Sequence, residues 1–214
     1  MVIGAQWGDE GKGKIVDYLA AKADVVVRSQ GGNNAGHTVV VDGKAYPLRL
    51  MPSGIMYPGT ICIVGTGVVI DPKSFLEEMK NLEDQGIDTK HLQISTRAQI
   101  VFPYHIRIDE AEEMRKGSRK IGTTKNGIGP CYADKINRIG IRICDLMDKG
   151  VFAEKLKYNV EQKNMVLEKL YGLEGFDYEK MLHDYLGYAE KLRPFVKDTN
   201  YMVKKPIKER KKVL

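Results

Sequence analysis

The sequence has few cysteines and no long apolar run. Its three cysteines, Cys62, Cys131 and Cys144, are odd in number and widely spaced, with no C-x-x-C pair. This argues against a disulfide framework or a zinc site and favours a reducing compartment. No apolar run approaches the roughly 18 residues of a membrane span, and no charged-then-apolar signal segment opens the chain. We therefore expect a cytoplasmic protein with no membrane partner.

The charge balance is basic, but much of the excess is local. The formal net charge is +6 and the pI about 9.0, which suits an anionic partner such as a nucleic acid, a membrane surface or a phosphorylated small molecule. Several of the basic residues lie between Lys204 and Lys212, at the extreme C-terminus. We interpret that stretch as a solvated helix face or chain end rather than a nucleic-acid-binding arm.

Alternating apolar runs and turn signals predict an α/β fold. A glycine-rich loop separates a predicted strand at residues 2–5 from a helix with Ile15, Leu19 and Ala23 on one face. Asp42-Gly43 predicts the turn of a β-hairpin after residues 39–41, and Asp71-Pro72 predicts a helix start, with the helix ending near Gly86. Further buried strands are predicted at residues 25–27, 61–64 and 92–95.

Two regions follow from this pattern. Residues 1–150 are predicted to form an α/β nucleotide-activating domain, with a mainly parallel sheet, flanking helices and a small antiparallel hairpin, similar to P-loop NTPases. From residue 151 the apolar residues recur about four apart, as in Phe152, Leu156 and Val160, with no strand evident between the helices. We take residues 151–214 as a C-terminal helical segment.

The first glycine loop, residues 8–14, lies between the predicted first strand and a helix N-terminus, where backbone N–H groups and a lysine favour a phosphate chain. It is not a Walker A sequence, because Gln6 and Gly13 stand where that motif needs Gly and Ser or Thr. Asp9 is the nearest hard oxygen ligand for a metal and is also a candidate base. The alternative is that Asp9 and Glu10 only complement the helix dipole.

Two more loops are expected near the first. The second, residues 31–38, follows the strand at 25–27, so in a parallel sheet it brings Asn33, Asn34 and His37 to the edge that carries Asp9. A structural role is the alternative for this histidine. The third, residues 122–130, has two hydroxyls and a lysine suited to another phosphate, with Arg138 after it, although an ordinary surface turn would look similar.

Three motifs resemble those of the adenylosuccinate synthetase family. They are the string QWGDEGKGK at residues 6–14, the loop GGNNAGHT at 31–38, and GTT with GIGP at 122–130; their order and spacing match over essentially the whole chain. The resemblance implies that IMP, L-aspartate and GTP give adenylosuccinate, GDP and phosphate, with magnesium, through a 6-phosphoryl-IMP intermediate in purine synthesis. We assign no function to Lys125 and Asn126.

The resemblance also implies roles for individual residues. Asp9 would be the base on N1 of IMP and a magnesium ligand together with the Gly36 carbonyl, His37 the general acid, and Lys12 a stabiliser of phosphate charge. The implied GTP contacts are Gly8, Asp9, Glu10, Gly11, Lys12, Gly13, Lys14, Gly36, His37 and Thr38. The implied IMP contacts are Asp9, Glu10, Gly11, Lys12, Asn34, Ala35, Gly36, His37, Thr124 and Arg138.

Arg138 would reach the IMP site of a partner subunit, which implies a homodimer with shared sites. Members of the family are about twice as long, and the second half would supply guanine and aspartate recognition. We therefore expect this chain to be a fragment. The alternative to the ligase function is an inactive module that only binds nucleotide or dimerises.

Overall fold

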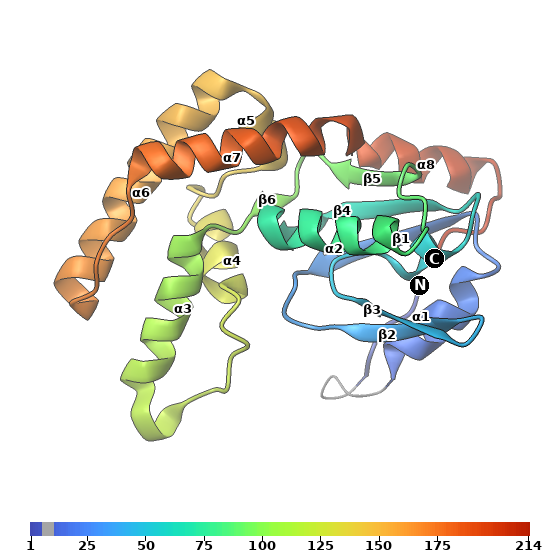
Figure 1. The fold of residues 1–214 in the computed structure, drawn as a ribbon, viewed down its shortest axis with the longest axis horizontal. Coiled ribbons are helices and arrows are strands. Elements are labelled where there is room, and N and C mark those ends of the chain that lie inside the picture. The colour runs from blue at the N-terminus through green and yellow to red at the C-terminus, as the bar shows by residue number, and fades with distance from the viewer. Residues whose placement is uncertain (6–10) are drawn as a thin grey trace.

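A computed structural model describes residues 1–5 and 11–214 (Figure 1). The strands in this part of the chain are β1 Val25–Gly31, β2 His37–Val41, β3 Lys44–Leu48, β4 Ile61–Ile70, β5 Leu92–Ser95, β6 Gln99–Ile100 and β7 Val196–Lys197. The α-helices are α1 Lys12–Ala20, α2 Pro72–Asp84, α3 Pro103–Lys116, α4 Ile128–Ile136, α5 Ile143–Met147, α6 Lys149–Tyr171, α7 Tyr178–Leu192 and α8 Thr199–Lys208. Short 3-10 turns are η1 Ser53–Met56, η2 Gly117–Arg119 and η3 Arg193–Phe195.

The main sheet is parallel, as predicted. Its order is β1-β4-β5-β7, and β6 pairs with the far end of β4. All these pairings are parallel, and the first two strands pair Val26 with Cys62. The runs of β-branched and aliphatic residues in β1 and β4 are largely buried, which is typical of a sheet covered on both faces. The carboxyl ends of β1 and β4 therefore lie at one edge.

Two local predictions are confirmed by turn and cap geometry. In the β2–β3 hairpin, Asp42 and Gly43 have φ values of 50° and 76°, the left-handed conformation of a type I′ turn. Asp71 caps α2, accepting a hydrogen bond from the Lys73 backbone N–H at 3.1 Å, and Pro72 occupies the first turn. The chain then turns at Gly86, whose φ is 84°.

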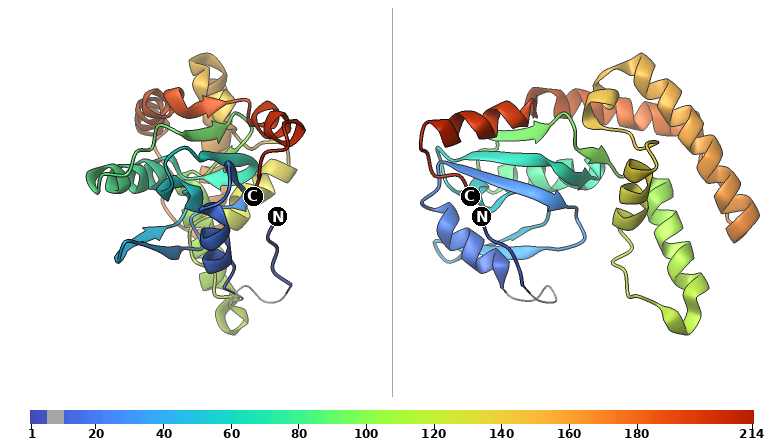
Figure 2. Two further views of the ribbon diagram at one scale, coloured as in Figure 1. Left: turned by 90° about the vertical axis from the view of Figure 1, so that its right-hand side faces the viewer. Right: turned by 180° about the vertical axis from the view of Figure 1, so that it is seen from behind.

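The helical segment packs on the sheet domain. Phe152, Leu156 and Tyr185 belong to the same buried cluster as the strand residues of β4 and β5. α8 lies beside the sheet, while α3 and α6 project from the opposite end of the molecule (Figures 1 and 2). The two-residue strand β7 interrupts this helical region and pairs with β5. The boundary at residue 150 stays a prediction.

The predicted strand at residues 2–5 is wrong, because this segment has no strand structure and Ile3 is exposed. One edge of β1 pairs with β4, and the other with the chain end, where Val213 bridges Val25. From Val25 to Val27, β1 is therefore hydrogen-bonded on both edges, which leaves no edge there for this short, glycine-containing run.

The apolar face predicted for the first helix is also wrong in part. α1 forms, but it ends at Ala20, before Ala23. Ile15 and Leu19 are 52% and 37% exposed, and Ala20 is the buried residue of this helix. The helix therefore rests on its small alanine side chain rather than on the larger apolar residues.

All three cysteines are free thiols, and burial raises the pKa of Cys62 to about 12. Within residues 1–5 and 11–214, no helix is long and apolar enough to cross a membrane. At the C-terminal end, Lys205 and Lys211 lie 4.0 Å and 3.5 Å from the carboxylate of Glu209, so part of the basic stretch is locally paired.

Candidate functional site

The first loop is described from Gly11 onward; Gly8, Asp9 and Glu10 of the predicted site lie outside the described residues. Gly11 adopts a left-handed conformation, φ 76°, at the N-cap of α1. Lys12, Gly13 and Lys14 form the first turn of that helix, and Lys14 is exposed. The backbone N–H groups of such a turn point out of the helix with the positive end of its dipole, which favours an anion.

His37, the first residue of β2, packs against this turn. A Cβ on Gly13 would lie 2.8 Å from the His37 Cβ and 2.9 Å from its Cγ, so only glycine allows the approach. The Nε2 atom of His37 lies 2.9 Å from the Ser53 hydroxyl. Burial lowers the pKa of His37, and the charge of Arg28 lowers it further, so the imidazole is neutral at pH 7.

The second loop is held by hydrogen bonds at its start. The Arg28 guanidinium donates to the Gly32 carbonyl at 2.7 Å, and the Gly32 N–H donates to the Asn34 side chain at 3.2 Å. The Gly31 N–H donates to the Tyr132 hydroxyl at 2.9 Å, and that hydroxyl donates to the Gly67 carbonyl at 2.6 Å. The loop is thus linked to α4, which follows the third loop.

The third loop is tied to α3 by two carboxylates. Glu113 accepts hydrogen bonds from the backbone N–H groups of Ile121 at 3.2 Å and Gly122 at 2.9 Å. Asp109 accepts from the Gly127 N–H at 3.0 Å. Neither residue was predicted from the sequence. The signal that could have found them is the spacing of His105, Asp109 and Glu113, which puts three polar residues on one face of a helix.

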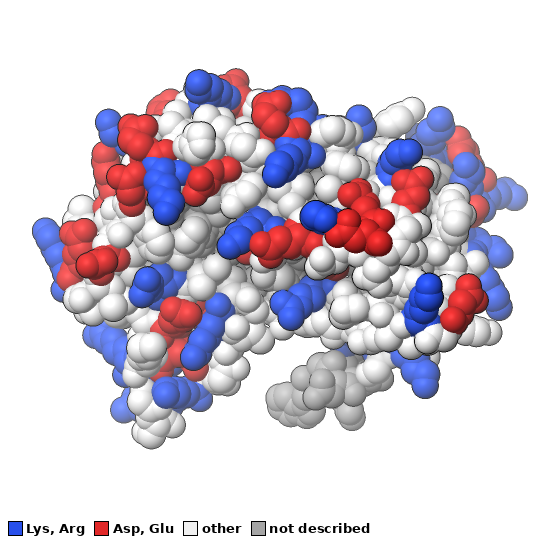
Figure 3. All heavy atoms as spheres, viewed as in Figure 1, with Lys and Arg blue, Asp and Glu red and all other residues white. Residues whose placement is uncertain are grey.

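The structure brings part of the predicted set together. Gly13 and His37 are in contact, and the Gly32 backbone packs against the Ile128 side chain, which joins the second loop to the start of α4. Thr124 and Arg138 are exposed, and no side-chain hydrogen bond links either of them to another described residue. In Figure 3 acidic and basic side chains are interspersed on the visible face.

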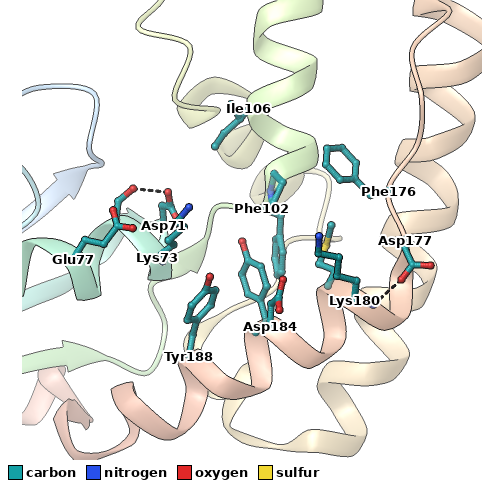
Figure 4. A pocket seen from close by; sticks show the side chains of 14 residues that line it. Asp71, Lys73, Glu77, Phe102, Ile106, Phe176, Asp177, Lys180, Asp184 and Tyr188 are labelled. Carbon is teal, nitrogen blue, oxygen red and sulfur yellow. Dashed lines mark hydrogen bonds between the residues drawn. The ribbon is translucent and has the colours of Figure 1, made fainter.

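A separate cavity of about 510 Å³ lies between α2, α3 and α7 (Figure 4). Its wall includes Phe102 and Tyr185, whose rings stack with centroids 4.5 Å apart, and Tyr188. Carboxylates of α2 and α7, including Glu77 and Asp184, stand around it. No described residue of the predicted nucleotide site lines this cavity.

The family model of adenylosuccinate synthetase matches residues 1–214. The chain belongs to the adenylosuccinate synthetase family. It is 62% identical over 214 residues to the adenylosuccinate synthetase of Thermoanaerobacter sp. (strain X514), and 55% identical to that of Clostridioides difficile (strain 630). Each match covers 100% of this chain and 50% of the relative. The chain thus spans about half the length of the curated relatives it matches.

The fold agrees with this membership. The solved structure of fully ligated adenylosuccinate synthetase from Plasmodium falciparum superposes with a TM-score of 0.88 at 39% identity, covering 99% of this chain and 49% of that one. The mainly parallel sheet with flanking helices and a small antiparallel hairpin is therefore the fold of this half of an adenylosuccinate synthetase.

The donors available for magnesium suit a site completed by phosphates. No group of three His, Cys, Asp or Glu side chains that could hold a metal occurs among the described residues. Mg²⁺ is commonly held by one or two protein oxygens together with substrate phosphates and water, so such a cluster is not required. Gly36 is exposed and has no side chain to cover its carbonyl oxygen, which suits that role.

Proposed function

We propose that this chain is the nucleotide-activating half of a GTP-dependent ligase that joins L-aspartate to IMP and forms adenylosuccinate. The observation that carries the proposal is the family match over all 214 residues, at 62% identity to a curated adenylosuccinate synthetase. The contact between the first turn of α1 and His37 supports it, because it combines an anion-binding helix end with a neutral imidazole. The phosphorylated substrates fit a cytoplasmic enzyme.

In the proposed mechanism the chain positions IMP O6 against the γ-phosphate of GTP. Asp9 takes the proton from N1 of IMP, so that O6 attacks the γ-phosphorus, the bond to the β–γ bridging oxygen breaks and GDP leaves. His37 donates a hydrogen bond to the transferring phosphoryl group, and Lys12 with the α1 backbone stabilises the phosphate charge. Aspartate then displaces phosphate from C6.

The other proposed contacts follow the same assignment. Asp9 and the Gly36 carbonyl would hold Mg²⁺, which neutralises charge on the phosphates when bound. GTP contacts would come from residues 8–14 and 36–38, and IMP contacts from 9–12, 34–37 and Thr124. Arg138 would complete the IMP site of a second copy in a homodimer; its exposed position on the described surface is compatible with that role.

The test joins this chain to the C-terminal half of the Thermoanaerobacter relative and measures adenylosuccinate formation from IMP, aspartate, GTP and Mg²⁺. We expect turnover, and its loss in Asp9→Asn, with Glu112→Gln as a control because Glu112 is exposed. Nucleotide binding without turnover in the joined protein would favour the module over the ligase. Near-normal turnover of Asp9→Asn would contradict the assignment of the base.

A further inference from the structure

Three buried polar residues of α3 lie four residues apart, and all three contact the unit formed by the third loop and α4. His105, Asp109 and Glu113 are only 2%, 6% and 4% exposed. Residues at this spacing share one face of a helix. We call them the α3 polar stripe. Buried charged groups are costly unless they are hydrogen-bonded, so the partners of the stripe are what keep it in place.

At one end of the stripe, His105 fixes the body of α4. Its Nδ1 accepts a hydrogen bond from the Phe102 N–H at 2.9 Å, so the proton lies on Nε2, which donates to Asp134 at 2.9 Å. Lys163 of α6 donates to the other oxygen of Asp134 at 2.5 Å. Burial would raise the pKa of Asp134, but the bonds from His105 and Lys163 outweigh it and lower that pKa. The carboxylate is therefore charged and fully engaged.

In the middle of the stripe, Asp109 fixes the end of the loop. Its carboxylate accepts a hydrogen bond from the N–H of Gly127, which is the N-cap residue of α4. Gly127 has φ 68°, and a Cβ there would lie 2.7 Å from the Ile106 backbone nitrogen. Glycine is thus required twice at this position, for its conformation and for its close approach to α3.

At the far end, Glu113 fixes the start of the loop through Ile121 and Gly122. Burial raises the pKa of this carboxyl, but hydrogen bonds from the backbone at Gly122 and Ile121 and from Lys116 lower it overall. Lys116 lies 3.3 Å from the carboxylate and balances its charge. The segment between these two ties holds Thr123 to Asn126, including Thr124, the proposed IMP contact in a loop whose hydroxyls and lysine suit a phosphate.

We propose that Asp109 and Glu113 are positioning residues that hold the third loop ready for the 5′-phosphate of IMP. The inference rests on the proposed function, and it names residues that touch the loop rather than the nucleotide. A loop anchored at both ends by an ordered helix loses little further freedom when the phosphate arrives. If the anchors fail and only about one molecule in ten holds the loop correctly, the apparent affinity falls about tenfold.

The test compares Glu113→Gln and Asp109→Asn with Glu112→Gln in the joined protein, which contains the half expected to recognise guanine, by calorimetric titration with IMP, inosine and GTP. Glu112 is the exposed neighbour of Glu113 and is the matched control. We expect affinity for IMP to fall on the order of tenfold in both stripe variants. Affinity for GTP and for inosine, which lacks the phosphate, should change less than about twofold, and Glu112→Gln should behave as the parent.

Amide hydrogen exchange on the unchanged chain provides a readout independent of variant folding. The N–H groups of Ile121, Gly122 and Gly127 should be protected before IMP is added. Exchange as fast as that of an open loop would overturn the inference, as would unchanged IMP affinity in both variants or an equal loss for GTP. Absence of IMP binding by the joined protein without substitutions would contradict the proposed function and this inference together, whereas IMP binding that both variants retain would contradict the inference alone.

Discussion

At the residue scale, the contact between Gly13 and His37 has no room for a side chain. We predict that Gly13→Ala destabilises the chain by about 1–3 kcal/mol, because a new Cβ would overlap the imidazole. Gly129→Ala is the matched control, since Gly129 occupies the same position in the first turn of α4 and a Cβ there would meet nothing within 4 Å. Gly129→Ala should raise the free energy of unfolding by up to about 1 kcal/mol. Urea denaturation measures both, and a gain for Gly13→Ala would show that His37 moves freely.

Glu78 holds the segment after the β2–β3 hairpin in place through hydrogen bonds to its backbone. Its carboxylate accepts from the backbone N–H groups of Arg49, Leu50 and Met51 at 2.7, 2.8 and 3.1 Å. We predict that Glu78→Gln costs about 1–2 kcal/mol of unfolding free energy, because the amide offers one acceptor and brings a donor toward these donors.

Glu77→Gln provides the comparison for that measurement. Glu77 is exposed and should change stability by less than about 0.5 kcal/mol. If the two variants denature at the same urea concentration, the three backbone bonds to Glu78 do not contribute to stability.

At the scale of the element, the packing of α3, α4 and α6 predicts a loss of stability in acid. Burial lowers the pKa of His105, despite the opposing effect of Asp134, and the pKa of His37 is lowered as well. Below the ordinary histidine pKa of about 6.5 the unfolded chain binds more protons than the folded chain, so stability falls as the pH decreases. The lowered pKa of Asp134 adds a further loss below about pH 4.

The variant His105→Asn separates these contributions. Its side-chain oxygen can replace Nδ1 as the acceptor for the Phe102 N–H, but it does not titrate. We expect a smaller slope of unfolding free energy against pH between about pH 6.5 and 5, with the remainder due to His37. Urea denaturation over a pH series measures it; a slope equal to that of the parent would mean that His105 does not control this window.

The elements differ in how far the sequence could predict them. The α2 cap at Asp71 and the hairpin turn at Asp42-Gly43 are local, so the residues that decide them are neighbours. Residues 2–5 have a strand-like composition, but whether they pair depends on which segment fills the edge of β1. The α3 polar stripe was missed because the partners of His105 and Asp109 lie 29 and 18 residues away. The loop context alone made Asp9 a candidate metal ligand and base, but the GTP and IMP contacts of Gly8 to Glu10 could be assigned only through the family motif.

At the scale of the whole molecule, the end of the chain closes the sheet. The carbonyl of Lys212 accepts from Asp24 and Val25, and Leu214 exchanges backbone hydrogen bonds with Val25 and Val27. We predict that deleting residues 212–214 lowers the unfolding free energy by about 2–4 kcal/mol, since each such bond contributes about 1 kcal/mol net.

Thermal and urea denaturation measure this deletion, and amide exchange at Val25 and Val27 should become faster. Lys212→Ala keeps the backbone and should stay within about 0.5 kcal/mol of the parent. A deletion as stable as the parent would show that β1 does not need its second edge partner.

Tyr132 of α4 links the end of β1 to β4. The pairing of β1 with β4 shifts register between Arg28 and Gln30, and just beyond this irregularity the phenol oxygen bridges Gly31 and Gly67. The Tyr132 hydroxyl thus connects the two strands by hydrogen bonds, although it belongs to α4 rather than to either strand. The position of α4 relative to the end of β1 therefore depends on the length of one phenol side chain, and an error in strand register would break one of its two hydrogen bonds.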